Sequence, residues 1–282
     1  MNLHQTAPFL RAYRLFPHRL LNRLTAQLMT ARRPGFAVQA AIRLWIRRAA
    51  IDMDDFAPAS YSTLEEFFLR RLREGARPLQ AGLCSPVDGE VFAAGALLPG
   101  TTLAVKGQRL SVERLVNGRV HQAPLSSYEG GHYVAIFLSP RGYHHIHMPV
   151  AGRLLRCQWL AGRYFPQNAV ALRHIPAVYE RNERAVLFCA APDAGQFILV
   201  LVGASLVGGI HLADVPVERW RHGQPTELDL PYDKGQRLAH FSFGSTVVLL
   251  FPRGSVQRLV VKAGDAVRMG QPLGELNPLP EL

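Results

Sequence analysis

A glycine and a serine, Gly244 and Ser245, are followed by Thr246 and the apolar run Val247–Phe251. Glycine allows backbone conformations that other residues rarely adopt, and a serine hydroxyl could attack the carbonyl group just before it. Residues 246–251 are too few for a typical helix and too apolar for a loop, so they predict a buried strand. Ser245 would then lie where a turn enters a rigid core, and it is a candidate nucleophile for cutting its own chain.

A Gly-Ser pair between two strands is usually only a turn. The chain contains a second such pair, Gly254 and Ser255, which follows a prolyl turn at Pro252. We expect this second pair to be a simple turn. Other residues must therefore decide whether the first pair is reactive.

The histidines His144, His145 and His147 form the densest cluster of titratable groups. In an extended strand His145 and His147 share one face and His144 points to the other, because side chains alternate. Two such histidines can bind a transition metal, but a catalytic zinc usually has three protein ligands, and no H-E-x-x-H motif is present. The other interpretation makes one histidine a general base for Ser245. No metal site is predicted, but the spacing leaves both interpretations open.

A carboxylate that orients such a base would complete the site, and Asp88 is the candidate. It lies between Val87 and Gly89 in a predicted tight turn with apolar flanks. An Asp-Gly turn with its carboxylate in water is the simpler interpretation. Spacing alone does not choose between the two.

Short apolar runs separated by Gly, Pro and Asp predict an all-β body from about residue 85 onward. The runs are 131–138, 148–160, 185–189, 197–202, 246–251 and 258–261. Before this body, Ser62 is predicted to cap a short helix, with Glu65 near its third position. The predicted fold class is therefore α+β, with a mainly antiparallel β body and helices confined to the N-terminal part.

Two segments from opposite ends of this body, residues 85–91 and 261–274, are similar to the hairpins of biotinyl and lipoyl carrier domains. Those domains are flattened barrels in which strands from the two ends pair. The hairpin tip with its lysine is missing here. We therefore expect a related barrel architecture without a carrier function.

The net charge of +11 is unevenly distributed, because residues 1–51 contain nine arginines and no Asp or Glu. Such asymmetry indicates a polyanionic partner, either nucleic acid or an anionic membrane surface. Two basic amphipathic helices are predicted, one beginning at Pro17 and one near Phe36, separated by Pro34 and Gly35. Basic helices with Trp and Phe are typical of segments that lie on a membrane, and no nucleic-acid module accompanies the charge. Packing of these helices on the body, with the arginines in solvent, is the alternative.

The cysteines Cys84, Cys157 and Cys189 are odd in number and lack a C-x-x-C spacing, so we expect no disulfide framework and a reducing compartment. Residues 197–210 are too few for a spanning helix of roughly 20 residues and predict two buried strands around a turn. No signal peptide is predicted, because arginines interrupt the N-terminal segment.

The chain resembles phosphatidylserine decarboxylases of the bacterial proenzyme type over about residues 15–273. The stretches that carry the resemblance are 61–70, 85–89, 138–149, 182–184, 202–204 and 243–246. The resemblance implies that Asp88, His147 and Ser245 form a self-processing triad. It also implies that His144 assists decarboxylation.

The resemblance further implies that Ser245 attacks the carbonyl of Gly244, so that an ester replaces the peptide bond. Elimination and hydrolysis, with loss of ammonia, then leave a covalently bound pyruvoyl group at position 245. The beta chain 1–244 and the alpha chain 245–282 would remain together as a heterodimer. The pyruvoyl ketone would condense with the amine of phosphatidylserine and accept the electrons left when CO2 departs, giving phosphatidylethanolamine.

A lipid substrate gives the basic helices a purpose. The resemblance implies a peripheral protein at the cytoplasmic side of the cell membrane, bound to its anionic surface through residues 1–55. Residues 56–282 would form the decarboxylase domain. We expect no nucleic-acid partner.

Three positions depart from the residues usual in this family. Phe243 stands where leucine is usual, Gly142 where an acidic residue is common, and His145 where arginine is common. Phe243 should be tolerated before the reacting bond, whereas His145 adds a titratable neighbour to the base. The alternative function is a non-enzymatic membrane-surface module on a carrier-like barrel, with structural or metal-binding histidines.

Overall fold

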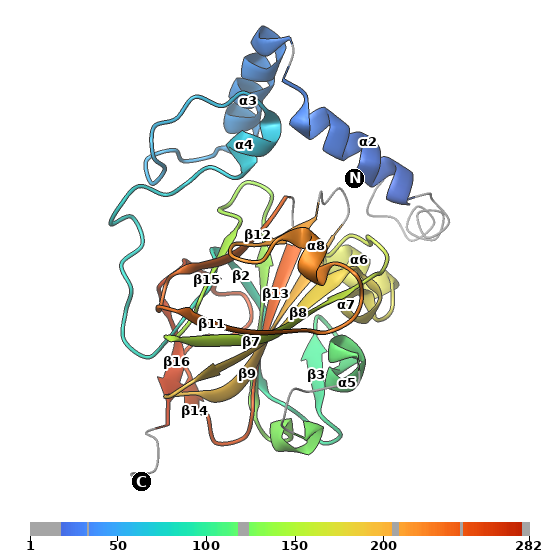
Figure 1. Ribbon diagram of the computed structural model, residues 1–282, viewed down its shortest axis with the longest axis vertical. Helices are drawn as coiled ribbons and strands as arrows, with labels where there is room; N and C mark the ends of the chain where they lie inside the picture. Colours follow the sequence, from blue (N-terminus) through green and yellow to red (C-terminus); the bar gives the residue numbers. More distant parts are fainter. Residues whose placement is uncertain (1–17, 33, 118–123, 205–208, 243–244, 278–282) are drawn as a thin grey trace.

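A large antiparallel β-sheet forms the centre of the protein (Figure 1). The computed structural model describes residues 18–32, 34–117, 124–204, 209–242 and 245–277. Phe243, Gly244 and every residue before His18, including the predicted helix start at Pro17, lie outside the described residues. The eight strands of the sheet follow the order β11-β7-β8-β9-β13-β5-β2-β15. Their bounds are β11 Thr226–Tyr232, β7 Gly152–Leu160, β8 Arg184–Ala191, β9 Gly195–Gly203, β13 Ser245–Phe251, β5 His132–Leu138, β2 Gly89–Ala96 and β15 Ala266–Val267.

Strand β13 lies between β5 and β9 and is buried along its whole length. Val247 and Leu249 pack into the hydrophobic core on one face of the sheet, and Val248 and Leu250 pack into the core on the other. A strand that is buried on both faces has no polar side, which is why it is a continuous apolar run in the sequence. The predicted strand is confirmed, and it begins one residue earlier, at Ser245.

Each face of the large sheet is covered by smaller elements. A three-stranded sheet in the order β10-β12-β6 shares one core, with Ile146, Ala239 and Ile210 among the core residues. Its strands are β10 Ile210–Leu212, β12 Arg237–Phe241 and β6 His145–His147. A hairpin and short helices contribute to the core on the other face. These are β3 Thr102–Val105, β4 Gln108–Ser111, α5 Val112–Val116, the 3-10 helix η2 Leu125–Tyr128, α6 Ala169–His174 and α7 Val178–Arg181.

The body is therefore not all-β, and this prediction was wrong. Its helices, including α8 Val217–Trp220, have four to six residues each. Such short helices show too few turns for a 3.6-residue periodicity and are stabilised mainly by tertiary packing. The first strand predicted within residues 197–210 is confirmed as β9, whereas β10 begins only at Ile210, the last residue of that segment. Residues 205–208 between them lie outside the described residues.

Segments from the two ends of the body pair with each other. β15 pairs with β2, and β16, Pro272–Leu276, pairs with both β1, Leu83–Cys84, and β14, Val256–Leu259. Pairing between the ends was predicted. The described strands form no closed barrel, however, because the large sheet ends at β11 on one side and at the two-residue strand β15 on the other.

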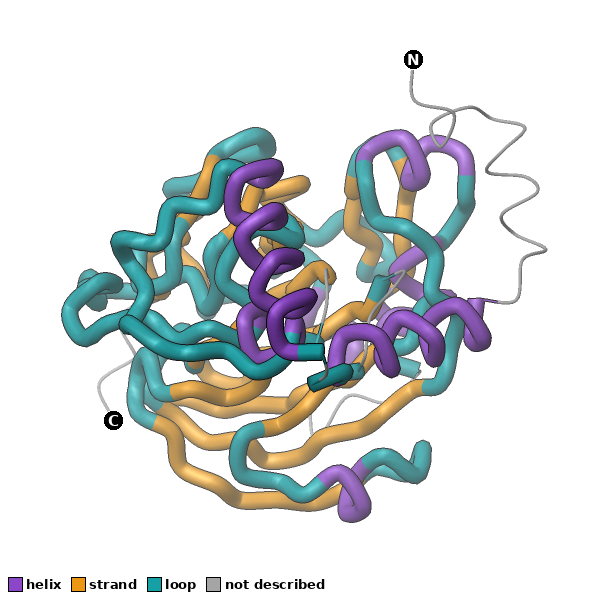
Figure 2. Tube along the Cα trace, turned by 90° about the horizontal axis from the view of Figure 1, so that it is seen from above, coloured by secondary structure: helices purple, strands orange, loops and turns teal. Residues whose placement is uncertain are grey.

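Three helices gather at one end of the β body, above the strands in Figure 1 and in front of them in the view from above in Figure 2. They are α2 His18–Thr30, α3 Gly35–Ala49 and α4 Leu64–Phe68. The ring of Trp45 in α3 lies 5.6 Å from that of Phe67 and 6.1 Å from that of Phe68, measured between centroids. Aromatic contacts of this kind contribute beyond their buried area. They attach α3 to the segment that carries α4.

The predicted cap of α4 is displaced by one residue. Thr63 is the N-cap, and its Oγ1 accepts a hydrogen bond from the backbone N–H of Glu66 at 3.0 Å. Glu66 in turn accepts from the N–H of Ser62 at 2.6 Å. The pairs Ser62-Thr63 and Glu65-Glu66 both fit the motif, so the sequence left two registers open. The extended backbone at Thr63 selects the second.

Candidate active site

Ser245 begins β13 in the middle of the large sheet. Its backbone lies opposite Leu138 of β5 on one side and Gly203 of β9 on the other. The residue is fully buried, and its Oγ has no hydrogen-bond partner among the described residues. A buried polar atom without a partner costs about 1–3 kcal/mol. The hydroxyl is therefore desolvated and free of competing hydrogen bonds among the described residues, as a reacting group needs to be.

The residue after Ser245 is held by a buried amide that no sequence pattern indicated. Thr246 Oγ1 donates to Oε1 of Gln167 at 2.6 Å. Gln167 Nε2 in turn donates to the carbonyl oxygens of Gly203 at 2.8 Å and Val202 at 3.3 Å. Gln167 thus joins β13 to β9 beside Ser245. This link helps to fix the direction of the Ser245 side chain.

His147 lies in β6, and both of its ring nitrogens are hydrogen-bonded. Nδ1 lies 2.7 Å from the carbonyl oxygen of Gly235, and Nε2 lies 2.8 Å from the hydroxyl of Tyr143. A carbonyl oxygen can only accept, so Nδ1 carries the proton and Nε2 accepts from Tyr143. Burial, with a further contribution from Arg237, lowers the pKa of His147 from 6.5. The ring is therefore neutral near pH 7, with Nε2 as its basic atom.

Asp88 makes no hydrogen bond to His147 among the described contacts. Its carboxylate accepts from Nε and Nη2 of Arg77 at 3.1 and 2.6 Å, and Oδ1 also accepts from the backbone N–H of Met269 at 2.7 Å. An arginine offers two donors in the plane that a carboxylate prefers, so Arg77 occupies both oxygens. Asp88 still acts on His147 through its charge, which opposes the larger lowering of the histidine pKa by burial.

His144 points away from His145 and His147, as predicted. Its ring lies against Phe68 of α4 with centroids 4.0 Å apart, while Tyr143 contacts the other two histidines at 5.0 and 5.6 Å. His144 is fully buried, its Nδ1 bonds the carbonyl oxygen of Gly142 at 3.1 Å, and Nε2 has no partner among the described residues.

Burial, and after it the charge of Arg70, lowers the pKa of His144 to about 3. The ring is therefore neutral. Because Nδ1 donates to a carbonyl, Nε2 has a free lone pair. His144 and Ser245 thus each present a buried polar atom without a partner.

The segments that carry Asp88, His147 and Ser245 meet at one end of the large sheet. β2 begins directly after Asp88 and pairs with β5, which ends opposite Ser245. The backbone N–H of His147 donates to the carbonyl of Pro86 at 2.9 Å, which ties β6 to the same end. No hydrogen bond among the described residues joins Ser245 to His144 or His147.

Chain connectivity limits the distance between His144 and Ser245. The backbone N–H of Phe241 donates to the carbonyl of His144 at 3.1 Å. Phe241 precedes Ser245 by four residues, so their Cα atoms are at most about 14 Å apart.

Arg70 is a buried residue whose role the sequence did not reveal. Its guanidinium lies 4.3 Å from the ring centre of Phe56 and 5.0 Å from that of Phe67. Nη2 donates to the carbonyl oxygens of Arg141 at 2.6 Å and Gly142 at 3.0 Å. Arg70 therefore holds the loop before His144. Burial lowers the pKa of Arg70 to about 10, which still leaves it charged at pH 7.

Three histidines from distant parts of the sequence form a row across the small sheet. His240 of β12 lies opposite His145 of β6 and His211 of β10, with ring centroids 5.7 and 4.9 Å apart. Burial is the main cause that lowers the pKa of His240 to about 3 and of His145 to about 4. In the described part of the chain, no group of three or more His, Cys, Asp or Glu residues is arranged to hold a metal ion.

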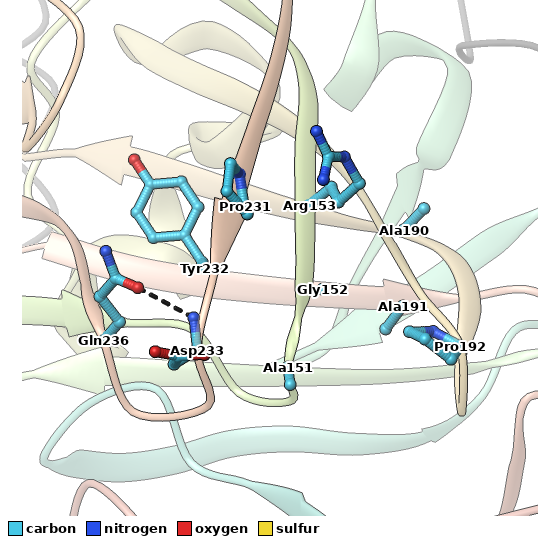
Figure 3. Close-up of a pocket in the computed structure, with 10 residues that line it drawn as sticks. All are labelled: Ala151, Gly152, Arg153, Ala190, Ala191, Pro192, Pro231, Tyr232, Asp233 and Gln236. Carbon is cyan, nitrogen blue, oxygen red and sulfur yellow. Dashed lines mark hydrogen bonds between the residues drawn. The ribbon is translucent and has the colours of Figure 1, made fainter.

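Two cavities lie near these residues. One of about 560 Å³ lies where β7, β8 and β11 meet, and none of the four predicted site residues lines it (Figure 3). It borders the turn of residues 233–236, in which the backbone N–H of Asp233 donates to the side chain of Gln236 at 2.9 Å. The carbonyl of Gly235 in the same turn accepts from Nδ1 of His147. The second cavity, of about 380 Å³, is lined by His147, Tyr143 and several arginines.

The chain is similar to proteins of one family. The family model described as phosphatidylserine decarboxylase matches residues 64–275. The phosphatidylserine decarboxylase proenzyme of Polaromonas naphthalenivorans is 36% identical over 266 residues, which cover 89% of this chain and 91% of that protein. The protein of the same name from Brevibacillus brevis is 38% identical over 244 residues, covering 83% and 86%. That of Delftia acidovorans is 36% identical over 278 residues, covering 93% and 95%.

Proposed function

Because the chain belongs to the phosphatidylserine decarboxylase family, we propose that it cleaves itself between Gly244 and Ser245 and uses the resulting pyruvoyl group at position 245. The family membership that the motifs indicated is confirmed. The chain is an enzyme that converts phosphatidylserine to phosphatidylethanolamine and CO2 and is made as a proenzyme. The cleavage position and the role of each residue are our proposal.

Self-cleavage requires a nucleophile and a base. Ser245 Oγ attacks the carbonyl carbon of Gly244, and the C–N bond to Ser245 breaks as the protonated His147 returns its proton to the leaving nitrogen, so that an ester and a free amine replace the amide. His147 accepts the hydroxyl proton at Nε2, the unprotonated nitrogen of its neutral ring, and Tyr143 gives up its hydrogen bond to that atom for the step. Asp88 stabilises the protonated ring through its negative charge alone, while the Gly235 carbonyl holds Nδ1 where a hydrolase triad has its carboxylate.

The surroundings of Ser245 suit a pyruvoyl group made from that residue. The single observation that carries the proposal is the buried Ser245 Oγ, which has no partner among the described residues at the start of a central strand. A pyruvoyl ketone supplies a sink for the electrons released when CO2 departs. Burial excludes water from this position and strengthens every electrostatic interaction there.

His144 is the proposed proton donor and acceptor during decarboxylation. Its Nε2 has a free lone pair and is buried, while Nδ1 is held by Gly142 and the ring by Phe68. A fixed ring with one free nitrogen can hold a proton at a defined atom. Arg70 acts through the loop, because it holds the Gly142 carbonyl that in turn orients His144.

The helical end is proposed to bind the cytoplasmic side of the cell membrane. No helix of the described chain has both the length and the apolarity to cross a bilayer. Leu24 and Leu28 of α2 and Phe36 and Leu44 of α3 are 54–78% exposed. The exposed arginines of α3 are Arg43, Arg47 and Arg48. Exposed apolar residues beside arginines are typical of helices that lie in an anionic interface. Residues 1–55 would then form the membrane segment and 56–282 the decarboxylase domain.

Intact mass measurement of the purified chain tests the proposal. We expect fragments of 244 and 38 residues that remain associated, the shorter one beginning with a pyruvoyl group instead of a free amine. Borohydride should add hydrogen to this ketone and abolish activity. An active preparation that contains a single intact chain would contradict the proposal.

A further inference from the structure

The cavity beside His147 is lined by four arginines and no acidic residue. We call it the arginine pocket, and its arginines are Arg71, Arg73, Arg77 and Arg237. Arg71 and Arg73 follow α4, while Arg237 begins β12, so the fold brings together charges from distant parts of the chain. Like charges that converge with too few counter-charges repel one another, and a bound anion relieves this repulsion.

Only one of the four arginines is neutralised. Arg77 pairs with Asp88 at 2.6 Å and with Asp55 at 2.7 Å. Arg71, Arg73 and Arg237 are exposed and have no ion pair within 4 Å among the described residues, and only Arg73 interacts at longer range with a carboxylate, that of Asp55. Three guanidinium groups are thus available to a ligand at the mouth of the pocket.

Two of these arginines bring their charge close to the histidines that line the pocket. Arg237 lies directly opposite His147 in the register of β12 and β6. Burial is the main cause of the lowered pKa of His145, and both Arg237 and Arg71 lower it further. Two side chains from different segments therefore bring positive charge to one place, beside the Tyr143 hydroxyl.

We propose that the arginine pocket is a binding site for a phosphate group. Planar guanidinium groups offer paired donors that match phosphate oxygens, and several such donors converge here. A cavity of about 380 Å³ leaves room for substituents on the phosphate. The site itself stands on the arginines. Its assignment to the phosphodiester of a phospholipid headgroup rests on the proposed function, and free phosphate is the other source of the same chemistry.

Calorimetric titration of the full chain carrying Ser245→Ala tests the site. This variant lacks the hydroxyl for cleavage, so binding is measured whether or not maturation occurs as proposed. The probes are inorganic phosphate and glycerophosphoserine, the headgroup without its acyl chains. We expect Arg71→Gln with Arg237→Gln to weaken binding of the probe at least about tenfold, since two charge-assisted contacts are lost. The pair Arg71→Lys and Arg237→Lys should recover part of it.

Arg109→Gln is the matched control, because Arg109 of β4 is also exposed and has no ion pair among the described residues. It should leave binding unchanged. Glycerophosphoserine binding that depends on the pocket arginines assigns the site to the lipid headgroup, whereas binding of phosphate alone assigns it to free phosphate. Equal affinity of the double glutamine variant, or an equal loss in Arg109→Gln, would overturn the proposal. An uncut wild-type chain would instead count against the proposed function alone.

Discussion

The two glycine-serine pairs of this chain have the same composition and opposite surroundings. Ser245 is fully buried between β5 and β9, and its hydroxyl has no partner among the described residues. Ser255 is partly exposed in a turn, where Gly254 has φ of +87° and the Ser255 N–H donates to the Pro252 carbonyl at 3.3 Å. The prediction that the second pair is a turn is confirmed. A shared dipeptide therefore says little about reactivity, and what differs is burial and the neighbouring groups.

The largest expected difference is between the two hydroxyl deletions. Ser245→Ala should abolish both cleavage and decarboxylation, because no oxygen remains to attack the Gly244 carbonyl. Ser255→Ala should cleave like the wild type. Intact mass and CO2 release measure the two effects. Full activity of the Ser245 variant would mean that another residue is the nucleophile.

Replacement of the proposed base should slow cleavage strongly without removing the nucleophile. His147→Ala is expected to reduce the cleavage rate by about 10²- to 10⁴-fold, the usual contribution of a positioned general base. The rate is measured from the growth of the 38-residue fragment. His222, an exposed histidine in a turn, is the control. A normal rate in His147→Ala would exclude His147 as the base.

Replacement of His144 should affect decarboxylation and leave self-cleavage intact. His144→Ala should still yield both fragments, while its decarboxylation turnover falls by about 10²-fold or more, because the group proposed to take up and return a proton at Nε2 is gone. Cleavage is followed by mass and turnover by CO2 release from the cleaved protein. If the variant does not cleave, His144 and not His147 serves Ser245.

Gln167 gives a smaller and more local effect. Gln167→Leu removes the acceptor of the Thr246 hydroxyl and the link to Gly203, so Ser245 loses part of its positioning and cleavage should slow about tenfold. Gln158→Leu is the control, since Gln158 is also a buried glutamine with one backbone contact, to Gly223 at 3.3 Å. Gln167→Leu should also lose more stability in thermal unfolding, because Gln167 makes three hydrogen bonds and Gln158 one. Equal cleavage rates in the two would show that Gln167 is only structural.

Lowering the pH should gradually reduce the stability of the fold around Ser245. His144, His145 and His240 keep folded pKa values of about 3, 4 and 3, against 6.5 in the unfolded chain, chiefly because of burial. The unfolded chain therefore binds more protons as the pH falls below 6.5, and the free energy of unfolding should decrease from there toward pH 4. Urea titrations across this range measure the slope. His240→Gln should flatten it, and an unchanged slope would show that His240 titrates normally.

The neighbourhood of the reactive pair was only partly predictable. The apolar run after Ser245 predicted β13 because a strand buried on both faces needs apolar side chains at every position. Alternation in the strand correctly separated His144 from His145 and His147. The predicted cap of α4 was wrong by one residue because two overlapping capping motifs fit there. The short helices of the body were not predicted because they show too little hydrophobic periodicity.

No local sequence pattern predicts the contacts that define the site. Arg77 donates to the carboxylate of Asp88, and Tyr143 donates to Nε2 of His147. Gln167 accepts from the hydroxyl of Thr246, which is 79 residues away in the sequence. In each case several donors or acceptors in the sequence were chemically equivalent. Distance in the folded chain chose among them.

By itself, the sequence determined which segments must be buried and which residue types could react, because hydrophobic periodicity and side-chain chemistry are local properties. It also carried the ordered motifs that indicate the family. Only the tertiary structure decided that Ser245 is buried without a partner among the described residues, that Asp88 is held by Arg77, and that unpaired arginines meet beside His147. Desolvation and electrostatic fields depend on which distant segments pack together, and that is settled only when the whole chain has folded.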